Sequence, residues 1–355
     1  MKLLEYLLEY TNTVVNEGGA AGHMLHPFQL DKIAKCTDII SYFNELASFL
    51  EKGGGASLKI DGTNCSIKLV ERNGMQMFVL DRMTKDEDDI VGMTSDDVER
   101  KYSNHPFNYG HYAKTTLDCF NECLPHIMPL LKKLGVAGNS SVMLNVEFVD
   151  GKTNIVEFDH SFIAIHGLLE IITMPSGYRK TKEMRSNSSV IDTICKKMNK
   201  LLESKGISVV SQVPAILKRK PDFNKVLAAD FTVVRNGNKE TKTLISWMND
   251  YDNIKKGATV VLNDGKRIQA TAITNIKRIA AGEDLASIAP EKYWGNLLSG
   301  FFMMYSTLML GKELNAAMDT VFGDCAKQEG IVIRDEQING TDAPVKVTGD
   351  FIFRA

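Results

Sequence analysis

The stretch from Ser57 to Val70 constrains the fold of this 355-residue chain more than any other. It follows three glycines at 53–55 and alternates apolar and polar residues, which predicts a strand, a tight turn and a returning strand. Lys59 lies where the first strand ends, two residues before Asp61 and Gly62. A glycine lets the backbone approach a ligand closely, and a lysine with a lowered pKa is a nucleophile. This stretch is therefore either part of an active site or a surface hairpin with a solvated lysine.

The composition is that of a soluble globular protein, with 44% hydrophobic and 24% charged residues. The formal net charge is −2, so a nucleic-acid partner would have to be bound by a local basic patch. No run of about 18 apolar residues predicts a membrane span. Residues 1–10 carry acidic residues inside an apolar pattern, which predicts an amphipathic helix and not a signal peptide. We therefore expect a cytoplasmic protein, in the host cytoplasm if the chain is viral.

Six cysteines are scattered along the chain. Cys119 and Cys123 are close, at helical spacing, and His126 is near them. A zinc site would need a second pair of ligands, which the sequence lacks. The cysteines are therefore expected to be buried free thiols.

The hydrophobic pattern divides the chain into four segments. Residues 1–50 are expected to form a helical segment packed on the core. Residues 51–175 alternate as strands around a helix at about 111–134. Residues 176–325 are mostly helical in period, and residues 326–355 return to a strand pattern. The fold class expected from this order is α+β.

Candidate site residues follow several of the predicted strands. A hairpin that turns at 72–74 ends at Arg82, a cation suited to ribose and phosphate contacts. The strand that begins at Val142 carries Glu147, whose carboxylate needs a partner or a metal if it is buried. Phe162 and His166 follow, and each either stacks on a base or packs in the core.

The last segment also carries a carboxylate and a cation on or beside predicted strands. Glu329 and Gly330 precede an apolar strand at 331–335, and a turn at 339–340 leads to a second strand that carries Lys346. A carboxylate suited to a metal and a cation suited to a phosphate thus occur together again.

In chain order these features resemble the motifs of the covalent nucleotidyltransferases, which include ATP-dependent DNA ligases, RNA ligases and mRNA-capping enzymes. The resemblance covers roughly residues 55–170 and 326–350. The matching residues are Lys59, Asp61, Gly62, Arg82, Glu147, Glu329, Gly330 and Lys346. The resemblance implies a ligase-type core of antiparallel sheets flanked by helices. The segment 176–325 would then be an insertion that acts as a substrate clamp.

The resemblance also implies a chemistry. Lys59 would attack the α-phosphate of ATP, expel pyrophosphate and hold AMP as a phosphoramidate. Lys346 would neutralise the α-phosphate, because nucleotidyl transfer depends on positioning and on cancelling negative charge. Arg82 would contact the nucleotide sugar or the acceptor phosphate.

The remaining site residues follow from the same resemblance. Glu147 would bind a ribose hydroxyl or a metal, and Glu329 would help to hold Mg²⁺ or Mn²⁺, which prefer oxygen ligands. Asp61 and Gly62 would complete the nucleotide site. Either Phe162 or His166 would stack on adenine.

Two departures narrow the expected function. The family often has two lysines in its last motif, whereas here Thr348 stands two residues after Lys346. Nine residues follow Lys346, so the OB-fold of DNA ligases and capping enzymes is not expected. Within the family, this set of motifs most resembles that of the phage-type RNA ligases, which join 3′-hydroxyl and 5′-phosphate ends. A nick-sealing DNA ligase and a binding protein without turnover remain as alternatives.

Overall fold

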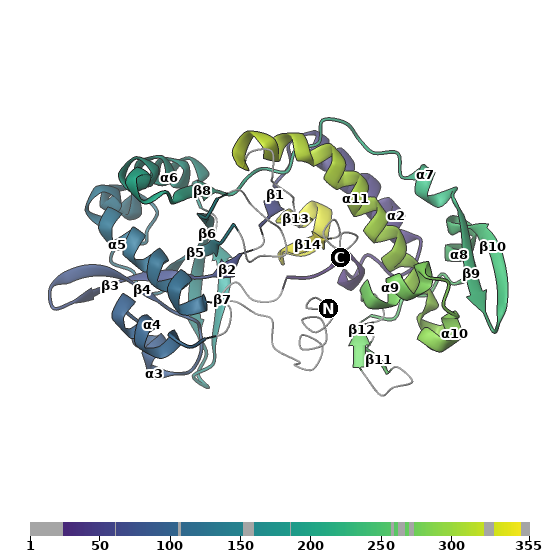
Figure 1. Ribbon diagram of the computed structural model, residues 1–355, viewed down its shortest axis with the longest axis horizontal. Coiled ribbons are helices and arrows are strands. Elements are labelled where there is room, and N and C mark those ends of the chain that lie inside the picture. The colour runs from purple at the N-terminus through teal and green to yellow at the C-terminus, as the bar shows by residue number, and fades with distance from the viewer. Residues whose placement is uncertain are drawn as a thin grey trace.

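The chain combines helices with mostly antiparallel sheets (Figure 1). The computed structural model describes residues 24–60, 62–105, 108–151, 160–184, 186–256, 259–261, 267–269, 273–322 and 330–348. A small sheet lies in the middle of the molecule, between a lobe built on a large sheet and a lobe rich in helices.

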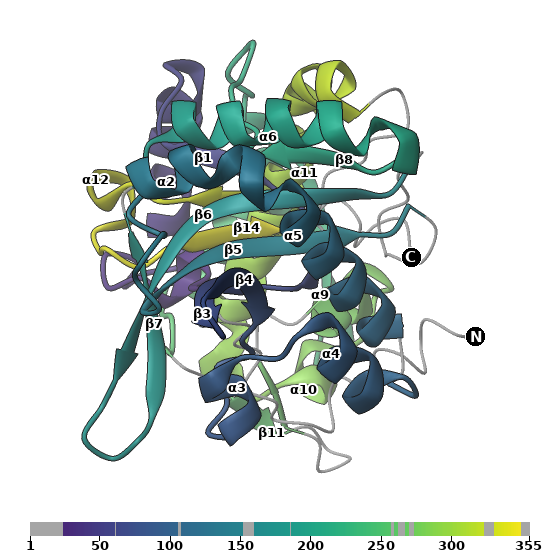
Figure 2. The same cartoon turned by 90° about the vertical axis from the view of Figure 1, so that its left-hand side faces the viewer.

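The large sheet has seven strands. The path β4-β3-β5-β6-β7 is antiparallel, and β2 pairs with β5 antiparallel. β8 pairs with β6 in parallel. The helices α5 and α6 cover one face of this sheet (Figure 2). The strands are β2 (Thr63–Asn64), β3 (Ile67–Arg72), β4 (Met75–Leu80), β5 (Val142–Val149), β6 (Phe162–Thr173), β7 (Arg179–Met184) and β8 (Ser208–Ser211). The helices of this lobe are α3 (Glu87–Val91), α4 (Ser95–Tyr102), α5 (Tyr109–Lys133) and α6 (Ser188–Leu202).

The small sheet has the order β1-β13-β14 and joins distant parts of the chain. Its strands are β1 (Ala56–Lys59), β13 (Gly330–Ile333) and β14 (Val345–Thr348), and the short helix α12 (Glu336–Asn339) links the last two. One face carries Leu58, Ile331 and Val347 into the core beside α2 (Asp38–Glu51) and α11 (Trp294–Phe322). The backbone at 213–215 bonds to the other edge of β1, so β8 leads directly into the small sheet.

The helix-rich lobe packs along α11. Its other elements are α7 (Asn224–Leu227), β9 (Asp230–Arg235), β10 (Asn238–Thr243), α8 (Leu244–Asp250), β11 (Thr259–Val261), β12 (Arg267–Gln269), α9 (Ile273–Ala280) and α10 (Leu285–Ile288). Single 3₁₀ turns occur at Pro27–Gln29, Glu203–Lys205 and Glu291–Tyr293. Among the helices that the structure describes, none combines the length and apolarity needed to cross a bilayer.

Most predicted elements outside 176–325 are confirmed. The helix expected at about 111–134 is α5, and the strand expected from Val142 is β5. The turn at 72–74 is a tight hairpin turn in which Asn73 and Gly74 have φ of 52° and 74°. The five cysteines that the structure describes are buried and free, as expected.

The predicted boundary at residue 176 is wrong. It falls inside the large sheet, because β7 pairs with β6 over six residues and β8 extends the sheet to Ser211. The sequence of β7 is RKTKEM, and its alternate side chains are exposed or half-buried. An edge strand of this kind lacks the apolar signal on which the boundary was based. The predictions for residues 1–23 and 349–355 lie outside the described residues.

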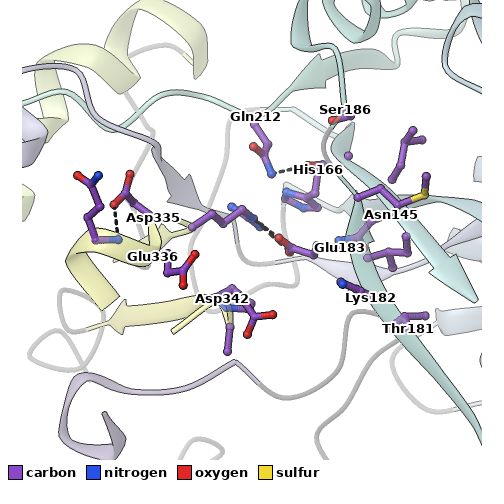
Figure 3. Close-up of a pocket in the computed structure, with 18 residues that line it drawn as sticks. Asn145, His166, Thr181, Lys182, Glu183, Ser186, Gln212, Asp335, Glu336 and Asp342 are labelled. Atoms are coloured by element: carbon purple, nitrogen blue, oxygen red, sulfur yellow. Dashed lines mark hydrogen bonds and ion pairs between the residues drawn. The ribbon is translucent and has the colours of Figure 1, made fainter. Parts of the chain in front are cut away.

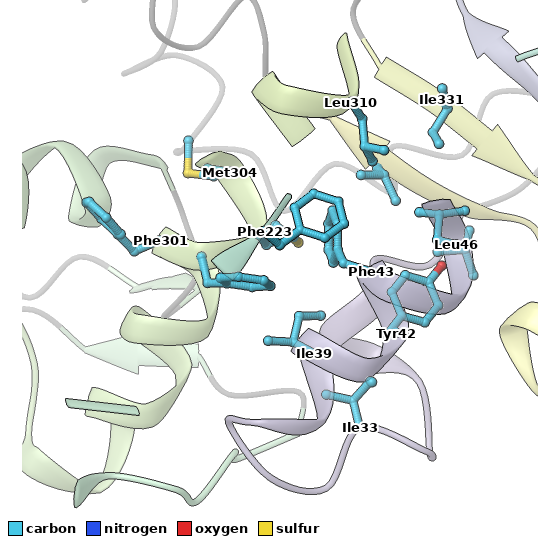
Figure 4. Close-up of a cluster of buried hydrophobic side chains, with 14 of the residues drawn as sticks. Ile33, Ile39, Tyr42, Phe43, Leu46, Phe223, Phe301, Met304, Leu310 and Ile331 are labelled. Carbon is cyan, nitrogen blue, oxygen red and sulfur yellow. The ribbon is translucent and has the colours of Figure 1, made fainter. Parts of the chain in front are cut away.

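The core between α2 and α11 is held by interlocking aromatic rings (Figure 4). Phe43 of α2 is fully buried. Its ring lies edge-on to Phe223 and to Phe302, with a centroid distance of 5.8 Å in each case. Such pairs add to the energy of burial itself. Phe43 therefore couples α2 to α11 and to the chain that leads into α7.

We expect the Phe43→Ala substitution to lower the free energy of unfolding by about 3–5 kcal/mol, because it removes a fully buried ring and leaves a cavity. Urea denaturation followed by circular dichroism measures this loss. The matched control is Tyr178→Ala, since Tyr178 is 56% exposed; its effect should stay within about 0.5 kcal/mol. Equal effects of the two substitutions would contradict the packing described.

Candidate functional site: a cleft between two sheets

The register of the small sheet brings Lys59 and Lys346 onto one face. Lys59 is paired with Gly330, and Ser57 is aligned with Val332 and then with Lys346. Directly opposed residues of antiparallel strands share a face, and successive residues alternate. Since the intervening residues point into the core, both lysines belong to the face away from it. Two residues 287 positions apart in the sequence (346 − 59) thus meet on one surface.

Two glycines leave room around Lys59. Gly330 lies opposite Lys59 and has a φ of 147°, a conformation that favours glycine. A Cβ atom added at Gly62 would lie 3.0 Å from the carbonyl oxygen of Phe148 and 3.3 Å from the Cβ of Glu147. The loop after Lys59 therefore runs against β5, at the strand that carries Glu147.

Glu147 has the partner that its position in an apolar strand required. Its Oε2 lies 3.0 Å from Nε2 of His166 on the neighbouring strand β6. The two side chains are 23% and 12% exposed, so the pair is largely buried but reachable. Asn64, next to the Lys59 loop, is paired in register with Glu147. The structure thus gathers Lys59, Gly62, Glu147 and His166 where the two sheets meet.

Phe162 is placed differently from His166. Its side chain is fully buried within the core cluster. His166, four residues further along β6, lines a cavity. Of the two roles that the sequence left open for Phe162, the structure shows core packing.

A cavity of about 790 Å³ opens between β6, β7 and the end of β13 (Figure 3). Figure 3 shows His166, Lys182 and Glu183 on the large-sheet side, with Asp335 and Glu336 facing them. The lining residues also include Asn145, Thr181, Ser186, Gln212, Arg334 and Asp342. Among the described residues, the charged groups that line the cavity are two cations and four carboxylates in addition to His166. The cavity therefore suits hydrogen-bond donors better than it suits phosphates.

Arg334 joins the two sheets beside this cavity. Its Nε donates to both carboxylate oxygens of Glu183 on β7, at 3.1 and 2.9 Å. Its Nη1 donates to Oγ of Ser57 on β1, at 2.9 Å. Ser57 lies two residues before Lys59 on the same face. This bridge consequently fixes the strand of Lys59 against the large sheet.

Arg82 lies two residues after the end of β4 and is not among the described residues that line the cavity. Its guanidinium stacks over Tyr109 and Tyr102, at 4.5 and 5.3 Å from the ring centroids. The preceding residue, Asp81, is buried and accepts from Lys68 at 2.6 Å and from Arg179 at 3.0 Å. The backbone beside Arg82 is thus anchored by buried ion pairs.

Cys65 is buried just before β3, and its backbone N–H donates to the carbonyl of Val146 on the strand of Glu147. Burial raises the pKa of the Cys65 thiol to about 12, although a hydrogen bond with Thr116 lowers it. The charge of Glu147 raises this pKa further, and the charge of Arg82 lowers it. The neutral thiol is therefore the favoured form of Cys65 in the folded protein.

Asp61 and Glu329 lie outside the described residues. Among the residues that are described, no cluster of three or more His, Cys, Asp or Glu side chains could hold a metal ion. Glu147 is the described carboxylate of the predicted metal pair. Mg²⁺ is commonly held by one or two carboxylates together with substrate phosphates and water, so this arrangement is compatible with a metal that arrives with a nucleotide.

Comparisons of the chain with protein-family models, with curated proteins and with solved structures found no match.

Arg334, Glu183, Asn145 and Gln212 were missed in the sequence. Arg334 comes directly after an apolar strand and Arg82 comes two residues after one, and this similar position is a signal that could have identified Arg334. Glu183 belongs to the polar edge strand β7, which the sequence placed in the insertion. Unless β7 is predicted as a strand of the large sheet, nothing in the sequence indicates that Glu183 contacts Arg334.

We expect Cys65 to be protected from iodoacetamide in the native protein at pH 8 and modified after denaturation, as read by peptide mass spectrometry. The pKa of its thiol is raised from 9.0 to about 12, so the folded state favours the neutral thiol. Its contribution to stability is complete below pH 9 and is lost as the pH rises towards 12. Modification of native Cys65 at pH 8 at the rate of a free thiol would contradict its burial.

We expect Arg334→Ala to lower the free energy of unfolding by about 1–2 kcal/mol, because Glu183 and Ser57 lose their shared partner. Urea denaturation measures the loss. Arg219→Ala is the control, because the Arg219 side chain is 80% exposed in its ion pair with Glu313 and should contribute less than about 1 kcal/mol. An Arg334 variant as stable as the control would show that the bridge contributes little.

Proposed function

We propose that this chain is an ATP-dependent polynucleotide ligase that acts through a covalent lysyl-AMP at Lys59. It would join 3′-hydroxyl and 5′-phosphate ends, with RNA the favoured substrate. The proposal includes the finer fold assignment, a ligase-type nucleotidyltransferase core.

The observation that carries this proposal is the register of the small sheet. Lys59, Gly330 and Lys346 come from the first and the last two motifs of the resemblance, and they meet on three adjacent strands. The strand that carries Glu147 runs beside the loop after Lys59. Unrelated residues spread over the chain would not be expected to converge in this way.

The cleft offers two chemically different ends for a nucleotide. The cavity beside His166 is lined by hydrogen-bonding groups and carboxylates, which match the amino group of a base and the hydroxyls of a ribose. The face with Lys59 and Lys346 suits phosphates. A nucleoside in the cavity would therefore direct its α-phosphate towards the lysines, and the His166 ring would be available for stacking on the base.

The proposed first step forms a bond between Nζ of Lys59 and the α-phosphorus of ATP. The bond from that phosphorus to the bridging oxygen breaks, pyrophosphate leaves, and the lysine ammonium loses two of its three protons to solvent or to the leaving group. Lys346 would offset the charge on the α-phosphate. In the second step the AMP would pass to a 5′-phosphate end, and a 3′-hydroxyl would then displace it.

A divalent ion, Mg²⁺ or Mn²⁺, would supply charge neutralisation at the phosphates. Glu147 would hold it through carboxylate oxygen, with Glu329 as the second ligand that the resemblance implies. The hydrogen bond with His166, which itself lines the cavity, would hold the Glu147 carboxylate in place.

One observation bears on the alternative of a binding protein without turnover. The register aligns residue 348 with Gly330, which lies directly opposite Lys59. The second lysine common in the family would be at this position, and here it is Thr348. One cation fewer next to the nucleophile is consistent with a slow first step.

We expect the wild-type protein to become covalently labelled by α-³²P-ATP and Mg²⁺, and Lys59→Ala and Lys59→Arg to lose the label entirely. Arginine keeps the positive charge but does not deprotonate, so it cannot act as the nucleophile. Denaturing electrophoresis reads the label. The control is Lys52→Ala, since Lys52 is exposed at the end of α2; it should label as the wild type does.

A Lys59→Arg variant that still labels would overturn the assignment of the nucleophile. Absence of label in the wild-type protein, purified free of bound AMP, would favour the binding-protein alternative. Joining assays on nicked RNA, single-stranded RNA and nicked duplex DNA then separate the RNA ligase from the DNA ligase.

A further inference from the structure

A second cavity, of about 600 Å³, lies in the helix-rich lobe. Its lining residues come from α7, the β9–β10 hairpin, the end of α9 and α11. None of its lining residues belongs to the cleft of Lys59. Small residues at Ala229, Ala281 and Gly282 are exposed at this cavity, which leaves it open to solvent.

A row of three aromatic rings forms one wall of the cavity. The rings of Phe231 and Phe301 have centroids 4.3 Å apart, and those of Phe301 and Tyr305 are 4.7 Å apart. Phe301 and Tyr305 are four residues apart on α11, so they share a helix face. Figure 4 shows Phe301 pointing away from Phe43 and Phe223. Tyr305 is 36% exposed, so the row ends in a ring that solvent reaches.

Cations lie beside these rings. Lys225 of α7 and Lys239 of β10 line the cavity and are exposed, and Asp230 is the one carboxylate among the described lining residues. Aromatic faces next to lysines are the combination by which proteins bind single-stranded nucleic acid, since bases stack on the rings and the lysines neutralise phosphates. A purely apolar ligand would gain nothing from the two cations.

We infer that this cavity is a second binding site, for single-stranded nucleic acid, in which a base stacks on Tyr305 and Lys225 and Lys239 contact the flanking phosphates. The inference rests on the proposed function, since it assigns to the helix-rich lobe the strand that the Lys59 site would join. It differs from that function in needing no nucleotide chemistry at Lys59.

The test is fluorescence anisotropy with 5′-fluorescein oligouridylate and oligodeoxythymidylate of about 12 nucleotides, a length within common single-strand sites. We expect Tyr305→Leu to weaken binding by roughly tenfold or more, and Tyr305→Phe to retain it, because stacking needs the ring and not the hydroxyl. Tyr178→Leu, an exposed aromatic residue in the other lobe, is the matched control and should bind as the wild type does.

The lysines give an independent readout. The double variant Lys225→Ala, Lys239→Ala should reduce the slope of log K against log salt by about 1.4, or about 0.7 for each lysine. This double variant also tests the second site if circular dichroism shows that Tyr305→Leu does not fold. Each variant should still be labelled at Lys59 by ATP as the wild type is.

Weaker oligonucleotide binding together with unchanged labelling supports the second site. Binding by Tyr305→Leu that equals that of Tyr178→Leu, with an unchanged salt slope in the lysine variant, overturns it. A wild-type protein that labels with ATP but binds neither oligonucleotide also overturns it, while the proposed adenylyl transfer stands. A wild-type protein that binds the oligonucleotides at this cavity but never labels would sink the proposed function alone.

Discussion

The pairing of β1 with β13 is the constraint on which the candidate site depends. Backbone hydrogen bonds between these strands set Lys59 opposite Gly330, and the next pair of strands sets Lys346 on the same face. A shift of one residue in this register would turn Lys59 into the core and bring Leu58 out. The apolar residues Leu58, Ile331 and Val347, which pack against α2 and α11, oppose such a shift. The core therefore specifies the orientation of the two lysines.

The two sheets share an apolar core, in which Phe162 and Ala164 of β6 cluster with Leu58 and Ile331, and polar contacts join them at the cleft. Arg334, at the end of β13, bridges Glu183 of the large sheet and Ser57 of the small sheet, while Glu147 pairs with His166 within the large sheet. These groups are partly exposed, so each contributes modestly to stability. Their directionality matters more, because charged hydrogen bonds fix the distance between the sheets to within the range of a good hydrogen bond. A cleft built this way is open to solvent and still defined in geometry.

Much of this arrangement could be predicted from the sequence, and the exceptions have physical causes. The hairpin turn at Asn73 and Gly74, the helix α5 and the strand of Glu147 carry strong local patterns. The edge strand β7 was missed because Met184 is the one apolar residue among its six. The role of Phe162 could not be decided because stacking and core packing use the same apolar ring. Which residues meet across the cleft depends on long-range pairing, which no local pattern encodes.

The small sheet has a consequence for how the chain folds during synthesis. β1 has no β13 to pair with until about 270 further residues have been made (330 − 59 = 271), and contacts this distant in sequence form slowly. The large sheet can pair its own strands much earlier, since β3 and β4 are joined by a two-residue turn. Until β13 emerges, β1 can pair only along the edge that bonds to residues 213–215, and its other edge stays open. The two lysines can therefore come together only when synthesis of the described chain is nearly finished, and the growing polypeptide has to protect one exposed strand edge for most of that time.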